Sequence, residues 1–141
     1  MKARFLVSLL GLALLIGVKS AWANDVCADP TVPKITSSVA ISSATTTQLF
    51  AAVTGKSIAL CGCDLVATGT NPTIQFKYGT HGSADCDTGA TSISGAMAPT
   101  AGTAIYIGGS YTAASAPTGN QMCITTGGTP NVQGLCTGAS Y

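Results

Sequence analysis

Charged side chains are scarce in this sequence, with six lysines and arginines and five aspartates and glutamates among 141 residues. Glutamate is absent, and the only arginine and the only tryptophan, Arg4 and Trp22, both lie in the first 23 residues. Beyond residue 23 the chain keeps three lysines against five aspartates. Nucleic-acid binding needs clustered cations that displace counterions from phosphates, so we predict no nucleic-acid partner. An enzyme that clamps phosphates or carboxylates with arginine is excluded as well.

The first 23 residues have the three parts of a secretory signal peptide. Lys2 and Arg4 give a positive start, residues 5–18 form an apolar run, and Ala21-Trp22-Ala23 is a small-x-small cleavage box. The apolar run is shorter than the roughly 20 residues that a membrane-spanning helix needs. We therefore predict cleavage after Ala23, a single mature domain over 24–141, and a secreted or periplasmic protein that is free of the membrane.

The pattern of the remaining residues predicts an all-β fold. Apolar residues recur at every second position, as in Ile74, Phe76 and Tyr78, which alternate with Gln75 and Lys77. Such alternation turns one face of a strand toward a core and the other toward water. Glycine- and proline-containing turn signals separate the candidates, and eight short strands at this spacing predict a single β-sandwich, jelly-roll-like in form. The predicted strands cover 34–42, 46–53, 56–68, 72–79, 92–98, 103–108, 120–126 and 131–137.

An even number of cysteines in a small exported domain indicates disulfides. Six cysteines allow 15 pairings, and the sequence leaves the pairing open. Strand parity places Cys61 and Cys63 on one face, opposite Ile58 and Leu60, and Cys123 on the second face of its own strand. Cys61 is not expected to bond Cys63, because side chains two apart on a strand point in parallel. The predicted disulfide cysteines are Cys27, Cys61, Cys63, Cys86, Cys123 and Cys136.

Two metal sites are possible alternatives. Cys61-Gly62-Cys63 could supply thiolates, although structural zinc sites use a gap of two to four residues and a second pair at similar spacing. Asp85-x-Asp87-x-Gly89 resembles a fragment of a calcium loop, but no acidic closing residue follows. We predict neither a metal nor any other cofactor.

His81 is the only histidine, and its loop is the one place where catalysis could reside. Ser83 and Asp85 lie close by in sequence, as a serine hydrolase would require. No nucleophile-elbow motif surrounds the serine, and nothing in the sequence fixes the imidazole. We therefore assign no catalytic residue, and we interpret the loop as a solvated turn.

Five short segments, in this order along the chain, resemble small β-rich phage virion and prophage-encoded proteins that are tail- or capsid-associated. The segments are residues 55–61 (GKSIALC), 71–80 (NPTIQFKYGT), 86–97, 117–124 (PTGNQMCI) and 132–135 (VQGL). The resemblance implies a structural protein, with the virion surface as an alternative location. It brings no known active site, so it assigns no residue a catalytic role.

Two functional hypotheses follow. The first is a non-enzymatic, secreted structural or surface-adhesion module, phage-like, whose partner is a second copy of itself or a cell-surface glycan. The alternative is a secreted hydrolase or carbohydrate-binding protein that uses His81, Asp85 and Asp87.

Overall fold

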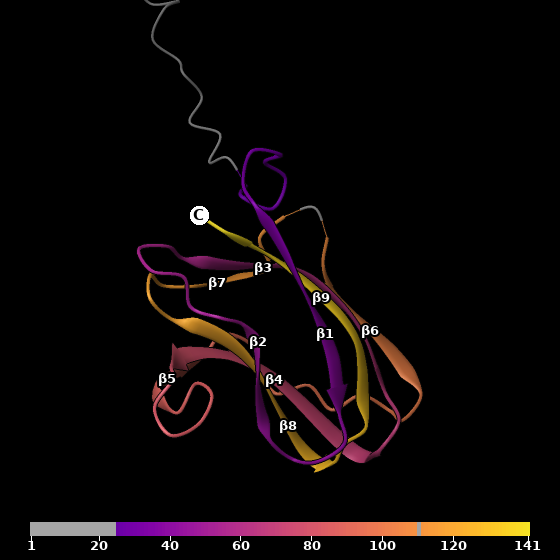
Figure 1. The fold of residues 1–141 in the computed structure, drawn as a ribbon. Helices are drawn as coiled ribbons and strands as arrows, with labels where there is room; N and C mark the ends of the chain where they lie inside the picture. The colour runs from indigo at the N-terminus through magenta and orange to yellow at the C-terminus, as the bar shows by residue number, and fades with distance from the viewer. Residues whose placement is uncertain (1–24, 110) are drawn as a thin grey trace, which may run out of the picture.

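The computed structural model describes residues 25–109 and 111–141, which fold into nine strands in two antiparallel sheets (Figure 1). The predicted signal peptide and its cleavage site lie outside the described residues. Within the described residues no helix is long and apolar enough to cross a membrane. The strands are β1 (Lys34–Ile41), β2 (Thr46–Phe50), β3 (Ile58–Ala67), β4 (Thr70–Thr80), β5 (Thr88–Ser92), β6 (Thr103–Gly108), β7 (Ala114–Ala116), β8 (Gln121–Thr129) and β9 (Val132–Ser140).

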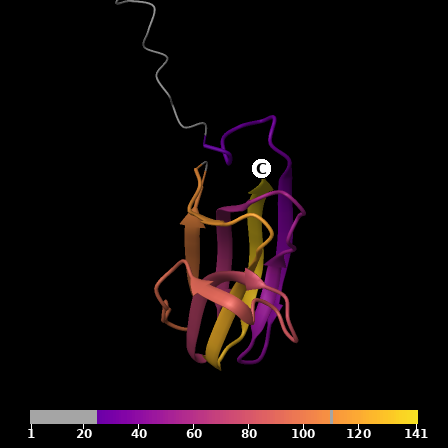
Figure 2. The same cartoon turned by 90° about the vertical axis from the view of Figure 1, so that its left-hand side faces the viewer.

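The chain passes back and forth between the two sheets, as it does in a jelly roll. Sheet A has the order β1-β9-β3-β6, and sheet B has the order β2-β8-β4-β5. Figure 2 shows the four long strands of sheet A side by side, with β6 in orange at one edge and β1 in indigo at the other. The short strand β7 pairs with β3 just beyond β6, so β6 and β7 are two parts of one interrupted edge strand. Counted in this way, two four-stranded sheets form an eight-stranded sandwich, and the predicted fold class is confirmed.

Alternating apolar residues fill the space between the sheets, as the sequence predicts. Ile74 and Phe76 on β4 are fully buried, and Tyr78 packs against the same core. Gln75 and Lys77 on the same strand are only half-buried. Sheet A contributes the facing half of the core, including Val39, Ile41, Ile58, Leu60 and Leu65.

The strand predicted over 92–98 is wrong. The chain pairs earlier, at β5, and beyond it keeps only an isolated bridge between Ile74 and Met97. The amides of Ile93 and Ser94 both donate to the Phe76 carbonyl, while the Phe76 amide donates to the Ser94 hydroxyl at 2.9 Å. A side-chain hydroxyl thus takes the place of a backbone partner, and the regular ladder ends there.

All six cysteines form disulfides, which pair Cys27 with Cys61, Cys63 with Cys136, and Cys86 with Cys123. The bridges confirm that Cys61 does not bond Cys63, and they leave no thiolate pair for a metal at these two positions. Three disulfides also indicate an oxidising compartment.

The prediction that Cys61 and Cys63 share a face is wrong. The pairing of β3 with β9 shifts between Leu60 and Gly62, so one extra residue enters β3 there. A bulge of this kind reverses the side-chain parity beyond it. Cys63 therefore joins the main core, while Cys61 lies on the outer face of sheet A in a small cluster with Ala59 and Ala139.

Candidate functional site

The predicted loop site lies between β4 and β5 and is held against sheet B. The Cys86–Cys123 disulfide joins the loop to β8, with Cys123 on the outer face that its parity predicts. Asp85 reaches the edge strand β2, where one carboxylate oxygen accepts the Gln48 amide at 3.0 Å. Its other oxygen lies 3.3 Å from Nδ1 of His81, whose side chain is 64% exposed. The fold thus brings His81 and Asp85 together in a solvated position.

Asp87 organises the backbone of this loop. Its carboxylate accepts the amides of Gly82, Ser83 and Ala84 at 2.7–2.9 Å, and also the Ser83 hydroxyl at 2.9 Å. The amide of Ala84 and the hydroxyl of Ser83 are the main causes that hold the pKa of Asp87 well below its ordinary value. The Ser83 hydroxyl donates to Asp87, so the Ser83–His81–Asp85 relay of a serine hydrolase is not assembled.

The two aspartates of the calcium-like fragment, Asp85 and Asp87, are occupied by hydrogen bonds within the protein. Their carboxylates are engaged by separate sets of protein donors, Asp85 by Gln48 and Asp87 by the loop amides. Across residues 25–109 and 111–141, no three histidine, cysteine or acidic side chains gather as a metal site would require.

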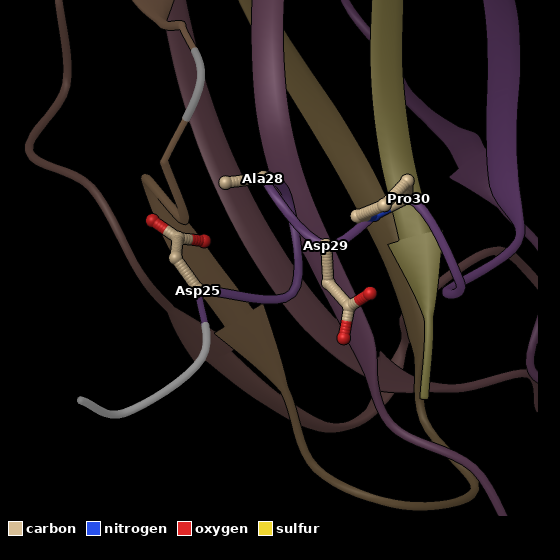
Figure 3. Close-up of a pocket in the computed structure, with 4 residues that line it drawn as sticks. All are labelled: Asp25, Ala28, Asp29 and Pro30. Atoms are coloured by element: carbon tan, nitrogen blue, oxygen red, sulfur yellow. The ribbon is translucent and has the colours of Figure 1, made fainter. Parts of the chain in front are cut away.

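A small cavity of about 280 Å³ lies beside the N-terminal segment and is lined by Asp25, Ala28, Asp29 and Pro30 (Figure 3). The two carboxylates point in different directions rather than toward a common centre. Asp25 accepts the amide and hydroxyl of Thr112 at 2.7–2.8 Å, and the Thr112 hydroxyl is the main cause that lowers the pKa of Asp25. Asp25 therefore ties this segment to the loop before β7.

A larger groove of about 710 Å³ lies where the β3–β4 connection meets the segment that leads into β6. No charged side chain lines it; its walls are Thr68, Gly69, Thr70, Asn71, Pro72, Thr73, Ala98, Pro99, Thr100 and Ala101. Asn71 is left-handed, with φ +48°, a conformation that asparagine tolerates better than most residues. The volume of the groove falls in the range of small-molecule sites, roughly 300–1,000 Å³.

The outer face of sheet A carries three exposed apolar side chains on neighbouring strands. They are Tyr106 (77% exposed) on β6, Leu135 (48%) on β9 and Val66 (40%) on β3. Asp64 lies in one row with two of them, because it pairs with Tyr106 on one side and with Leu135 on the other. Sequence reasoning did not single out this face, although the alternation of Ile105, Tyr106 and Ile107 already turns Tyr106 outward.

No family model, no curated protein and no solved structure matches this chain. The resemblance to phage virion proteins therefore stays a prediction. The groove and the outer face of sheet A remain as surfaces for binding, and the His81 loop as the place to test for catalysis.

Proposed function

We propose that the protein is a non-enzymatic, exported structural or surface-adhesion module that binds neutral glycans in the groove formed by residues 68–73 and 98–101. The observation that carries this proposal is the chemistry of the lining, which combines threonine and asparagine side chains with two prolines and no charge. An uncharged ligand with many hydroxyl groups matches hydrogen-bonding groups of this kind without leaving a charge unpaired. Weak contacts of this type suit adhesion, where many copies act together.

Export is part of the same proposal. The signal-peptide pattern and the three disulfides support a protein that is secreted or periplasmic after cleavage behind Ala23. Intact mass of the exported protein tests this, because it reports the cleavage site and the loss of six thiol hydrogens together. A mature form that begins at Met1 would contradict it. The phage-like alternative places the same module on a virion surface, where it would be found in purified particles.

The binding test uses neutral hexasaccharides, maltohexaose and chitohexaose, followed by amide chemical shifts of the protein. Binding should shift the amides around Asn71 and Thr100 and leave those of the His81 loop unchanged. Asn71→Gly removes the side-chain amide but keeps the left-handed backbone, so it should weaken binding without unfolding the protein. Asn120→Gly, on the turn before β8 and outside the groove, removes the same side-chain amide and is the control. Absence of shifts with every neutral saccharide would overturn the groove as a glycan site.

The alternative function is a secreted hydrolase, and the contact between His81 and Asp85 favours it. A carboxylate beside Nδ1 is the arrangement that orients a catalytic histidine. Wild type and His81→Ala should be compared on ester, glycan and peptide substrates. We expect no activity that the substitution removes, since the imidazole is exposed and Ser83 donates elsewhere. An activity present in wild type and lost in His81→Ala would make this loop the active site.

A further inference from the structure

The four edge strands of the sandwich differ in how well they are protected against pairing with another chain. In sheet B, β2 is interrupted by a bulge after Gln48 and is capped there by Asp85, while β5 has only five residues and its own irregularity. In sheet A, β1 has one charge, Lys34 at its first position, whose ammonium donates to the carbonyls of Val26 and Asp29 in the preceding segment. Charges, bulges and short length are the usual devices that keep an edge from pairing.

Strand β6 has neither a charge nor a bulge. Its sequence, TAIYIG, contains no charge and no proline, and its pairing with β3 is regular from Thr103 to Gly108. Tyr106 is the most exposed large apolar residue among those described. An exposed edge of this composition is a ready template for a further strand.

The backbone groups on this edge can be assigned from the ladder. Cys63 on β3 and Cys136 on β9 are paired with a Cα–Cα distance of 4.1 Å, the short spacing of a non-hydrogen-bonded pair, so the amide and carbonyl of Cys63 face β6 and its partner Ile107. Hydrogen-bonded positions alternate along an antiparallel strand. Ile105 and Ile107 therefore direct their amides and carbonyls toward β3. Ala104 and Tyr106 direct theirs toward the open side of the sheet, while Gly108 leaves the extended conformation, with φ +76°.

We propose that β6 pairs antiparallel with β6 of a second copy about a two-fold axis at Tyr106, so that two copies of sheet A join into one continuous sheet. The sequence around Tyr106 is self-complementary, as a two-fold interface requires. Rotation about this axis sets Ile105 opposite Ile107 of the other copy and Tyr106 opposite Tyr106. Isoleucine pairs and an aromatic pair are favourable across neighbouring strands.

Charge does not oppose this arrangement. The one carboxylate in the row is Asp64, which lies one strand away from Tyr106. In the joined sheet the two Asp64 side chains are three strand spacings apart, about 14 Å at 4.7–4.9 Å per strand. This exceeds the Debye length of about 10 Å at 0.1 M salt, so their repulsion is largely screened. The pairing is short, and we expect a dimer that dissociates on dilution.

This inference goes beyond the proposed function, because dimerisation can be measured without any saccharide. Sedimentation of the exported, oxidised protein over a wide range of concentrations should show a monomer–dimer equilibrium. Tyr106→Lys places two ammonium groups across the axis and should abolish the dimer. Ser38→Lys adds the same charge in the same row but at the opposite edge, on β1, and should leave the dimer intact. Melting temperatures of both variants confirm that they remain folded.

Amide hydrogen exchange gives a second measurement that does not depend on a substitution. Protection of the Tyr106 amide should rise with protein concentration, while the Ile105 and Ile107 amides, already bonded to β3, should not change. A wild type that is monomeric at every concentration would overturn the proposal. So would a dimer that Ser38→Lys abolishes or Tyr106→Lys leaves unchanged, and so would open-ended oligomers, which indicate head-to-tail pairing of β6 with β1.

Discussion

Replacing the Cys63–Cys136 disulfide by two alanines should produce a large loss of stability. This bridge links neighbouring strands β3 and β9, and it closes a loop with a sequence separation of 73 residues. The Cys86–Cys123 bridge lies inside this loop and spans 37 residues of it, so about 36 residues remain, for which the chain-entropy model gives about 3.8 kcal/mol at 25 °C through restriction of the unfolded chain. Both sulfur atoms also lie in the main core, so alanine removes packing contacts in addition. The expected loss is a large share of a total stability of about 5–15 kcal/mol.

Urea unfolding followed by far-ultraviolet circular dichroism measures this loss. The midpoint should fall, and the slope of the free energy against urea should rise, because the unfolded chain without the bridge exposes more surface. Cys27→Ala with Cys61→Ala is the control, since that bridge closes a separation of 34 residues, for which the same model also gives about 3.8 kcal/mol, but lies in the small outer cluster. The loss at Cys63 and Cys136 should exceed that of the control by the core packing that their sulfur atoms contribute. A loss below about 1 kcal/mol with an unchanged slope would refute the view that this bridge acts on the unfolded chain.

Two further predictions concern the core and the loop. Phe76→Asp should unfold the protein, because it buries an unpaired carboxylate at a cost of several kcal/mol. Gln75→Asp on the half-exposed opposite face loses one hydrogen bond to the Ser94 carbonyl and should lower the melting temperature far less. Equal effects would show that the register of β4 is wrong. Asp87→Asn should lower the melting temperature at neutral pH, since an amide cannot accept all the loop donors. The folded-state pKa of Asp87 is lowered, so its contribution is present above the ordinary value of 3.8 and is lost as the pH falls further. The difference between wild type and Asp87→Asn should therefore shrink below pH 3.8, and a constant difference would contradict this.

Much of the sandwich follows from the sequence because its signal is local. Each alternating run of apolar residues specifies one strand and the face that it buries, as Ile74 and Phe76 do for β4. The bulge after Leu60 could not be read in the same way. It depends on how β3 pairs with β9, some 70 residues away, and a single inserted residue moved Cys63 from the outer face to the core.

The candidate sites also differ in whether they depend on local or on long-range contacts. The contact between His81 and Asp85 lies within one loop, and the sequence already placed these residues together. The partner of Cys86, which fixes that loop on β8, could not be chosen from 15 pairings. The groove could not be predicted from the sequence, because its two walls, 68–73 and 98–101, are separated along the chain by most of β4 and by β5 and come together only in the folded protein.

The groove and the β6 edge together lead to a last prediction. The wall formed by residues 98–101 is followed almost directly by β6, so a dimer built on β6 carries two grooves as one rigid unit. A single weak site gains apparent affinity on a repetitive surface when two sites bind together, often by 10²–10⁴. Tyr106→Lys should then leave the affinity for a free neutral hexasaccharide unchanged but strongly reduce retention on a surface densely coated with the same saccharide. Ser38→Lys should retain both properties. Equal retention of the two variants on the coated surface would show that any binding is monovalent, and that the β6 dimer plays no part in adhesion.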